Sequence, residues 1–575
     1  MSTPKKEQSF RLRLLAGVVV LLALLYSGRL FDLQIVNGES YTEDGNRQYV
    51  SPGTAGFDRG SIYFTERKGN IVSAATLKSV YFVSTDPSKG EDPTSLYKAI
   101  NAYLNESDRK ELLNKLSEKN DTYEVIANSI SKESADAISE LKLKNIRVHR
   151  RAERNYPGGN LASHVLGFVG QDETTGDNFI GQAGVEKYYE DILQRGEDRL
   201  YVNFFAELFG NISSVIFEKG REREGDVVLT IEPAVELELE RVLALIMEKY
   251  DSTEAGGIVL DPRSGEVLGM AALPNFDPAK YHDAQISSFR NPLVQSVFEL
   301  GSIVKPLTMA AALDAGVVSP ESTYNDRGSL EISGYTISNY DGKARGVVDM
   351  QEILNQSLNT GAVYLSEKLG ASRFERYMQN YGFGELTGIE LPGESIGLTS
   401  TLNRSRPVEL ATASFGQGFA VSPITMARAL ASLGNGGLLI APHVTKQIIY
   451  PLYGREKIEK KVVRRVLDES TSIAVTRMLV EVVDTVLGGG KHKLENHTVA
   501  AKTGTAQMPQ PGGGYYPDKY LHSFFGYMPA YDPKFLIFLY VKDPKGVRYA
   551  SETLTDPFFD ITNFLLHYYE VPPDR

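Results

Sequence analysis

Strand-forming segments stand at both ends of the region that follows residue 225, and helix-forming segments lie between them. After an early hairpin, strands are expected again only near the C terminus, before a closing helix that begins at Pro557. The strand segments are 227–231, 257–261, 266–273, 499–504, 523–528 and 535–541. Strands from both ends of this region can bury their apolar faces only if they share one core. Strands and helices that are separated along the chain in this way predict an α+β fold. We expect one antiparallel sheet built from both ends, a helical lobe inserted in its middle, and a cleft where the two meet.

The N-terminal residues carry the pattern of a membrane anchor. Lysines and arginines precede an uncharged run at 14–28, which Arg29 closes. Because Arg13 and Arg29 can snorkel, the span extends to about residues 12–33, long enough for a transmembrane helix. A cleaved signal peptide is the alternative, but Arg29 stands where cleavage would fall and no Ala-x-Ala-like site follows. We therefore expect residues 1–11 in the cytoplasm, a single-pass anchor at 12–33 in the inner (cytoplasmic) membrane, and the rest of the chain outside.

The extracytoplasmic part divides into two predicted domains. Residues 34–225 form an N-terminal pedestal, which begins with an extended pair of segments and a turn near Lys68. Within it, the charge-rich stretch 86–147 has helical patterning and is expected to be an inserted α/β lobe with solvated faces. Glycine-rich stretches between 154 and 188 are interpreted as structural turns. Residues 226–575 form the second domain, which holds the predicted sheet and its inserted lobe.

Composition excludes several classes of function. The chain of 575 residues is 42% apolar and 23% charged, as ordinary folded proteins are. Its net charge of -12 argues against nucleic acid as the main partner, because phosphate binding needs a basic face. The absence of cysteine excludes disulfides and thiolate metal sites. His492, His497 and His522 lack metal-ligand spacing, so we expect neither a metal nor another cofactor.

A candidate nucleophile stands at the head of an apolar, helix-forming segment, where Ser302 and Lys305 are three residues apart. Residues i and i+3 share a helix face, so the Lys305 amine can reach the Ser302 hydroxyl and, when neutral, take its proton. Lysine is normally charged at pH 7, so this role needs a pKa lowered by burial or by a second cation. Taken alone, such a pair is more often an N-capping serine with a solvated lysine. The hypothesis therefore depends on residues elsewhere in the chain.

A second motif lies in a predicted turn between two helical stretches of the inserted lobe. There Ser357 could relay protons, and Asn359 could orient Lys305 and a substrate amide by hydrogen bonds. Capping of the second helix by both residues is an equally good explanation on this evidence alone.

A third motif, Lys502 to Thr505, lies on a predicted strand. Lys502 supplies the second cation that a neutral Lys305 requires. Thr503 and Thr505 can bind a substrate carboxylate, and Gly504 lets a substrate backbone approach the strand closely.

The ordered trio S-x-x-K, S-x-N and K-T-G is similar to the motif set of class A β-lactamases and penicillin-binding proteins. With its anchor, nearly the whole chain resembles a class B penicillin-binding protein, a monofunctional peptidoglycan D,D-transpeptidase of the division or elongation type. Leu300 and Ala501 depart from that family, which commonly has Pro and Gly there; both flank the reacting groups. Further stretches that resemble landmarks of the family are 59–62, 181–186, 416–423 and 522–526.

The resemblance implies a serine β-lactamase-like transpeptidase domain on a pedestal of the dimerisation type. Ser302, deprotonated by Lys305, would attack the penultimate D-Ala carbonyl of a peptidoglycan stem peptide, with the backbone amides of Ser302 and Thr505 as the oxyanion hole. Terminal D-Ala would leave, and an amine of a neighbouring stem peptide would form the cross-link. β-Lactams would acylate the same serine. Glycan polymerisation would fall to a membrane partner, with division or elongation proteins as further partners.

Three alternatives share these motifs. A class A β-lactamase also needs a carboxylate-activated water, and it needs neither an anchor nor a pedestal. A penicillin-sensing receptor needs a cytoplasmic signalling segment, whereas only residues 1–11 precede the expected anchor. An inactive wall-synthesis scaffold would not need every acylation residue.

Overall fold

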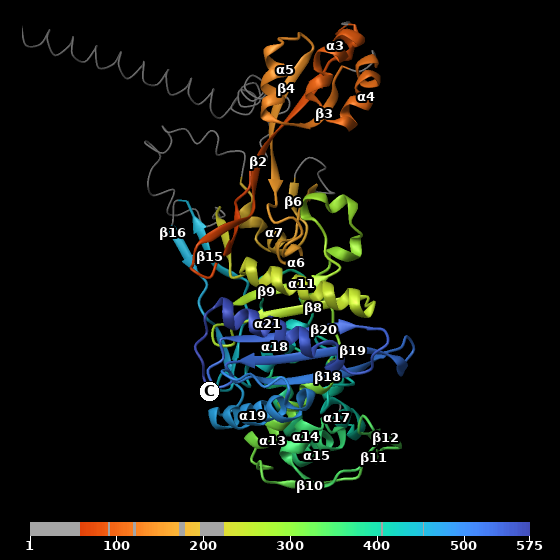
Figure 1. Ribbon diagram of the computed structural model, residues 1–575, viewed down its shortest axis with the longest axis vertical. Coiled ribbons are helices and arrows are strands. Elements are labelled where there is room, and N and C mark those ends of the chain that lie inside the picture. Colours follow the sequence, from red (N-terminus) through yellow and green to blue (C-terminus); the bar gives the residue numbers. More distant parts are fainter. Residues whose placement is uncertain are drawn as a thin grey trace, which may run out of the picture. The chain divides into compact units, whose positions relative to one another are not determined.

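The computed structural model describes residues 58–89, 92–118, 122–171, 179–195, 224–403, 406–451 and 454–575. The chain forms two compact units, which Figure 1 shows coloured along the sequence. The described residues of 78–153 belong to the smaller unit, and those of 59–77 and 154–575 to the larger. The expected tail and anchor, 1–11 and 12–33, lie outside the described residues. Where the chain is described, no helix is both long and apolar enough to span a membrane.

The smaller unit is the α/β lobe that the charge-rich stretch predicts. Its strands are the C-terminal part of β2 (Ile71–Thr85), β3 (Glu124–Ile130) and β4 (Ile146–Asn155), and its helices are α3 (Pro93–Ile100), α4 (Glu106–Ser117) and α5 (Lys132–Glu140). Asp92, Asn105 and Ser131 cap the three helices, because each side chain accepts hydrogen bonds from first-turn amides. Apolar residues such as Leu112 and Ile126 fill the core, and charged residues stay outside.

In the larger unit, the first strands pair with strands from much later in the chain. β1 (Ile62–Thr65) pairs antiparallel with the start of β2 and parallel with β7 (Asp226–Leu229). β7 pairs in turn with β15 (Thr445–Tyr450), which pairs with β16 (Gly454–Lys457). The extended pair with a turn near Lys68 is confirmed.

A buried ion cluster fixes the segment before β1. Arg59 Nε lies 2.7 Å from Glu186 Oε2, and Arg154 Nε lies 2.7 Å from Glu186 Oε1. Burial raises the pKa of Glu186, but the two guanidinium groups outweigh burial and bring the pKa below its usual value. Glu186 lies in a short helix, α7 (Gly184–Tyr188), within the glycine-rich region that was interpreted as turns. Its charged side chain is buried in the core. Neighbouring short elements are α6 (Ser163–Leu166), β5 (Val169–Gln171), β6 (Phe179–Gly181) and α8 (Glu190–Leu193).

Five antiparallel strands in the order β18-β19-β20-β8-β9 form the central sheet, so the prediction of one sheet built from both ends is confirmed. Their bounds are β8 (Glu254–Leu260), β9 (Val267–Leu273), β18 (Ala500–Pro509), β19 (Tyr515–Met528) and β20 (Phe535–Lys542). In β20, Ile537 and Leu539 enter one core while Leu536 and Phe538 enter another, because successive side chains of a strand point to opposite faces. A strand buried on both faces reads as a continuous apolar run.

Helices cover both faces of this sheet. On one face lie α11 (Pro233–Tyr250) and α21 (Thr555–Tyr568), and on the other α12 (Pro292–Gln295) and α18 (Pro423–Ala431). The remaining helices are α13 (Lys305–Asp314), α14 (Met350–Asn355), α15 (Asn359–Leu369), α16 (Ala371–Asn380), α17 (Pro407–Ala413), α19 (Glu469–Glu481) and α20 (Ala550–Thr553). Several of them, α13, α14, α15, α17 and α19, lie below β18 in Figure 1 and form the inserted lobe.

The expectation that strands return only near the C terminus is wrong. Three two-stranded ladders lie in the region that was expected to be helical: β10 (Thr323–Asp326) with β13 (Gly346–Asp349), β11 (Ser329–Ile332) with β12 (Tyr335–Ser338), and β14 (Leu438–Ile440) with β17 (Val462–Arg465). One signal was available. Ser333-Gly334 is a turn-forming dipeptide with alternating apolar residues on both sides, and in the structure both residues have the positive φ of a tight hairpin.

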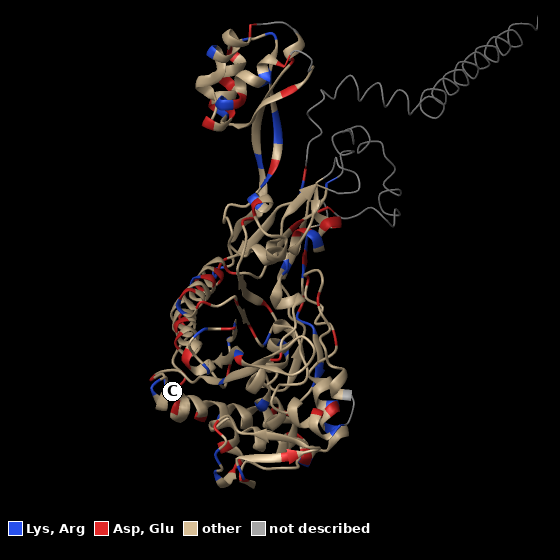
Figure 2. Ribbon diagram, turned by 90° about the vertical axis from the view of Figure 1, so that its right-hand side faces the viewer, with Lys and Arg blue, Asp and Glu red and all other residues tan. Residues whose placement is uncertain are grey.

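Charged residues of both signs are interspersed along the ribbon, as Figure 2 shows. Along the described residues, neither sign of charge is gathered in one segment.

Candidate active site

Ser302 lies in a 3-10 turn, residues 301–304, that runs directly into α13. The α-helix therefore begins at Lys305 rather than at the serine, but side chains at i and i+3 eclipse in a 3-10 turn and still face one side. No side chain caps either element, so the N-capping explanation of Ser302 does not hold. Gly301 has φ +65 and donates its N–H to Gly416 O at 3.0 Å, which holds the turn against the glycine-rich stretch at 416–423.

Lys305 is only 1% exposed, and the turn between α14 and α15 holds its amine. Nζ donates to Ser357 O at 2.5 Å and to Asn359 Oδ1 at 2.8 Å, and it lies within hydrogen-bond distance of Ser357 Oγ, at 3.2 Å. The explanation of Lys305 as a solvated side chain is therefore wrong. Within the described chain, no hydrogen bond joins the Lys305 amine to the Ser302 hydroxyl, although the i, i+3 spacing places both on one face.

Ser357 and Asn359 do not cap α15, because its N-cap residue is Leu358 and no side chain hydrogen-bonds there. Ser357 instead adopts a left-handed backbone, with φ +52. This conformation costs a non-glycine residue on the order of 1–3 kcal/mol. It turns both the carbonyl and the hydroxyl of Ser357 toward Lys305.

Lys502 brings a second amine to the same hydroxyl. From β18 it reaches Ser357 Oγ at 3.1 Å and its neighbour Thr503 O at 3.0 Å. Burial lowers the pKa of Lys502 to about 8. Burial, and after it the Lys502 charge, lower the pKa of Lys305 well below its usual value. Lys502 was expected from the sequence to lower the pKa of Lys305, but burial is the larger cause.

The K-T-G residues lie on the edge strand of the central sheet. Thr503 and Thr505 line the same pocket as Ser302, and Thr505 Oγ1 accepts a hydrogen bond from Ala550 N at 3.0 Å. A Cβ on Gly504 would lie 2.7 Å from Leu300 O. The structure thus gives Gly504 a constraint that the sequence argument did not consider, because its missing side chain makes room for the turn that carries Ser302.

The pocket around these groups has a volume of about 570 Å³, within the range of ligand sites. Aromatic residues that the sequence argument missed also line it. Tyr340 comes from the inserted lobe and Tyr549 from the segment before α20. Their rings contact edge to face, with the ring centroids 5.8 Å apart. Nothing in the sequence placed these two tyrosines together, because they are brought into contact only by packing of the lobe against the sheet.

Chemically, the site combines the Ser302 hydroxyl with two buried amines. The lowered pKa of Lys305 suits this amine to accept a proton, whereas Lys502, with a pKa of about 8, remains largely charged at pH 7. No Asp or Glu is among the described residues that line the pocket.

Comparison with known proteins agrees with this geometry. Residues 255–562 match the family model of the penicillin binding protein transpeptidase domain, and residues 56–228 match that of the penicillin-binding protein dimerisation domain. The stage V sporulation protein D of Bacillus subtilis (strain 168) is 34% identical over 554 residues, which cover 95% of this chain and 83% of that protein. The chain belongs to the class B penicillin-binding proteins. The family that the motifs indicated is therefore confirmed.

Further relatives span this penicillin-binding protein almost completely. The peptidoglycan D,D-transpeptidase FtsI of Escherichia coli (strain K12) is 27% identical, over 99% of this chain and 95% of that protein. Among solved structures, penicillin binding protein 2X from Streptococcus thermophilus matches with a TM-score of 0.73 and 21% identity, covering 90% of this chain and 81% of that one. Penicillin binding protein 3 from Mycobacterium tuberculosis, complexed with aztreonam, matches with a TM-score of 0.66 and 23% identity, covering 90% and 97%. These two likenesses establish the two-domain fold of the penicillin-binding protein.

Proposed function

We propose that this protein is a serine peptidoglycan D,D-transpeptidase that cross-links stem peptides and is acylated by β-lactams. The observation that carries the proposal is the position of Lys305. A buried amine held by Ser357 and Asn359, with a second lysine on the same hydroxyl, is suited to be a neutral base. The relatives named as D,D-transpeptidases give the substrate class.

In the first half-reaction, Lys305 takes the proton of the Ser302 hydroxyl as Ser302 Oγ attacks the penultimate D-Ala carbonyl. The backbone amides of Ser302 and Thr505 stabilise the oxyanion, and terminal D-Ala leaves with a proton. In the second half-reaction, an amine of a neighbouring stem peptide attacks the ester, releases Ser302 and forms the cross-link. A β-lactam follows the first half-reaction, but its leaving group stays attached.

The other motif residues assist both steps. Ser357, which bridges the two lysines, relays the proton toward the leaving amine. Asn359 orients Lys305 and the substrate amide. Lys502 keeps Lys305 neutral, and Thr503 and Thr505 bind the terminal carboxylate beside Gly504.

The pocket lining favours acyl transfer to an amine over hydrolysis. A β-lactamase of the alternative kind needs a carboxylate to activate water, and the described residues that line the pocket include none. An inactive scaffold is disfavoured because Ser302, Ser357 and Lys502 line one pocket and the Lys305 amine lies against Ser357.

We also propose the cellular setting that the sequence predicts. Residues 12–33 anchor the chain in the inner membrane with residues 1–11 in the cytoplasm, 34–225 form the pedestal, and 226–575 form the transpeptidase domain outside. A membrane glycan polymerase supplies the strands, and division or elongation proteins are further partners. The apolar run at 14–28 supports the anchor.

The experiment is covalent labelling of the full-length protein with a fluorescent penicillin, followed by mass spectrometry of the labelled peptide. The adduct is expected on Ser302, and Ser302→Ala should abolish it. Ser319→Ala, an exposed serine in the loop after α13, is the matched control and should label like the wild-type protein. Labelling of Ser302→Ala at the wild-type level would refute the nucleophile. Rapid loss of the adduct with release of hydrolysed penicillin would favour the β-lactamase instead.

A further inference from the structure

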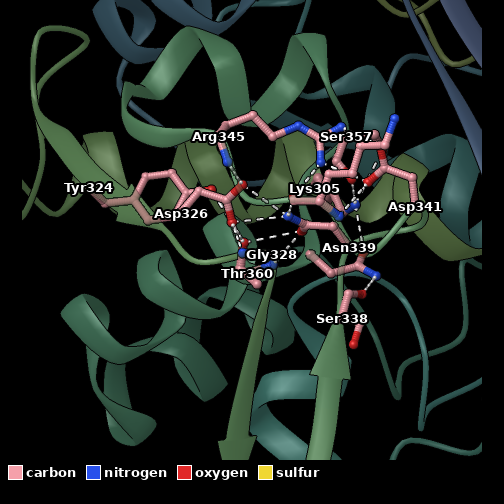
Figure 3. Close-up of polar contacts among 12 residues, drawn as sticks. Lys305, Tyr324, Asp326, Gly328, Ser338, Asn339, Asp341, Arg345, Ser357 and Thr360 are labelled. Carbon is pink, nitrogen blue, oxygen red and sulfur yellow. Dashed lines mark hydrogen bonds and ion pairs between the residues drawn. The ribbon is translucent and has the colours of Figure 1, made fainter.

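A carboxylate in the inserted lobe is buried without a cationic partner among the described residues. Asp326, the last residue of β10, is 1% exposed. It accepts hydrogen bonds from Gly328 N at 3.0 Å, Arg345 N at 3.0 Å, the Asn339 amide at 3.0 and 3.1 Å, and the Thr360 hydroxyl at 2.7 Å. The Arg345 guanidinium pairs with Asp341 instead. Figure 3 shows these donors converging on Asp326 from the loop and from α15.

The same cluster contacts the start of α15. Thr360, the residue after Asn359, is 4% exposed, and its N–H has no partner inside the helix. Asn339 Oδ1 accepts that N–H at 3.3 Å, while the Thr360 hydroxyl is directed to Asp326. The loop that follows β12 is thus fixed to the first turn of α15 through two side chains, Asn339 and Asp326.

This attachment sets which way the Asn359 amide faces. Asn359 Nδ2 donates to Ser338 O at 2.8 Å, and Ser338 immediately precedes Asn339. With its NH₂ group on the Ser338 carbonyl, Asn359 presents Oδ1 to Lys305 Nζ at 2.8 Å. An amide turned the other way would place its NH₂ group against the lysine and lose both hydrogen bonds.

We propose that Asp326, Asn339 and Thr360 are positioning residues for acylation. They hold the Ser338 carbonyl beside Asn359, so that the Asn359 amide is oriented with Oδ1 toward Lys305. The inference rests on the proposed function and deepens it. None of the three lines the pocket, so they act only through Asn359. The Asp326 charge is not among the causes that shift the pKa of Lys305, so the action is one of geometry.

The burial of the cluster distinguishes it from an ordinary loop network. Burial raises the pKa of Asp326, but the hydrogen bonds donated to it outweigh burial and bring the pKa below its usual value. Four donor groups from three separate segments satisfy one charge. Removing the Thr360 hydroxyl leaves Asp326 Oδ1 with two donors, Gly328 N and the Asn339 amide. It takes away the direct hydrogen bond between α15 and the buried charge, so the attachment of the loop to the helix weakens.

The test compares Thr360→Val with Thr360→Ser in the full-length protein. Valine keeps the shape but removes the hydroxyl from Asp326, whereas serine keeps it. We expect the rate of acylation by a fluorescent penicillin to fall about 10- to 100-fold in Thr360→Val and to stay near wild type in Thr360→Ser. Asp326→Asn is a second variant with the same expected loss. Asp341→Asn, an acidic residue of the same loop that pairs only with Arg345 and Lys343 N, is the matched control and should acylate normally.

A pH profile separates positioning from general loosening of the lobe. If Asn359 Oδ1 no longer accepts from Lys305, the charged form of the lysine loses a hydrogen bond and the pKa of Lys305 falls further. The acid limb of the acylation rate should therefore move to lower pH in Thr360→Val but not in Thr360→Ser. Equal rates in the two variants, or a slower Thr360→Val with an unshifted acid limb, would overturn the inference. Failure of the wild-type protein to be labelled would instead overturn the proposed function on which it rests.

Discussion

Lys305 and Lys502 are bridged by a single hydroxyl, because both amines lie within hydrogen-bond distance of Ser357 Oγ, at 3.2 and 3.1 Å. Two ammonium groups this close repel each other, and burial disfavours both charges. Burial and then the Lys502 charge lower the pKa of Lys305 well below its usual value, while the pKa of Lys502 falls to about 8. Near neutral pH the pair therefore holds one proton more readily than two, and Lys502 retains it.

Replacing Lys502 with methionine should shift the pH dependence of acylation. Loss of the neighbouring charge raises the pKa of Lys305, so more of the base is protonated at a given pH. The acid limb of the acylation rate should then move to higher pH, and the rate at pH 7 should fall about tenfold or more. Lys502→Arg keeps the charge and should leave the acid limb closer to its wild-type position. Stopped-flow measurement with a fluorescent penicillin from pH 5 to 9 gives the profiles of both variants and of the wild-type protein. If the acid limbs of Lys502→Met and the wild-type protein coincide, the Lys502 charge does not lower the pKa of Lys305.

Gly301 should not tolerate a side chain, for two separable reasons. Its φ of +65 strains any other residue by about 1–2 kcal/mol, and a Cβ would lie 2.7 Å from Thr505 O on the neighbouring strand. Gly316 has nearly the same φ, +64, but nothing within 4 Å of its Cβ position. Gly301→Ala should therefore lose acylation about tenfold or more beyond any effect of Gly316→Ala. Equal acylation rates for the two alanine variants would show that the contact with Thr505 does not position Ser302.

Glu186 should be essential for the stability of the larger unit. Removing its charge leaves Arg154 buried without an anionic partner among the described residues and leaves Arg59 with Glu190 alone, which costs about 3–5 kcal/mol. Glu238→Gln, which removes a surface pair with Arg241, should cost no more than about 1 kcal/mol. Chemical denaturation of the two variants beside the wild-type protein measures the difference. Similar midpoints for Glu186→Gln and Glu238→Gln would refute the role of the buried cluster.

Two neighbouring carboxyl groups on α11 should make the folded state less stable at alkaline pH. Burial, and then the adjacent Glu240, raise the pKa of Glu236 to about 8, and burial raises the pKa of Glu240 to about 7. Glu236 Oε2 accepts a hydrogen bond from the Met270 N–H at 2.6 Å, whereas Oε1 has no hydrogen-bond partner in the described chain. Because the folded-state pKa values lie above those of the unfolded chain, the stability that these groups contribute is present at low pH and is lost as pH rises through about 7 to 8.

Glu236→Gln tests that pH dependence. The melting temperature of the wild-type protein should fall between pH 6 and pH 9, and the variant should show a smaller fall because one of the two protons is no longer required. Glu248→Gln, an exposed position on the same helix, should keep the wild-type dependence. A fall of equal size in Glu236→Gln and the wild-type protein would contradict the assignment.

Much of the fold follows from local patterns in the chain. The hairpin of β8 and β9, the apolar run of β20 and the periodicity of α11 are each carried by contiguous residues, so the central sheet and its helical cover were predictable. The ladder of β11 and β12 was missed although its turn at Ser333 and Gly334 carries a local signal. Glu186 was interpreted as part of a turn, because its charge partners, Arg59 and Arg154, are distant in sequence.

The sequence by itself determined the family, the order of the three motifs and the residues that are proposed to react, because each motif is a short pattern of residue types. Only the tertiary structure decided that Lys305 is buried with a lowered pKa, that Ser357 bridges two lysines, and that Asp326 and Asn339 contact the first turn of α15, where Asn359 lies. Burial and the direction of an amide depend on segments that are far apart in the chain and meet only when the lobe packs on the sheet. A pKa or a hydrogen-bond register is therefore a property of that packing, and no contiguous stretch of residues encodes it.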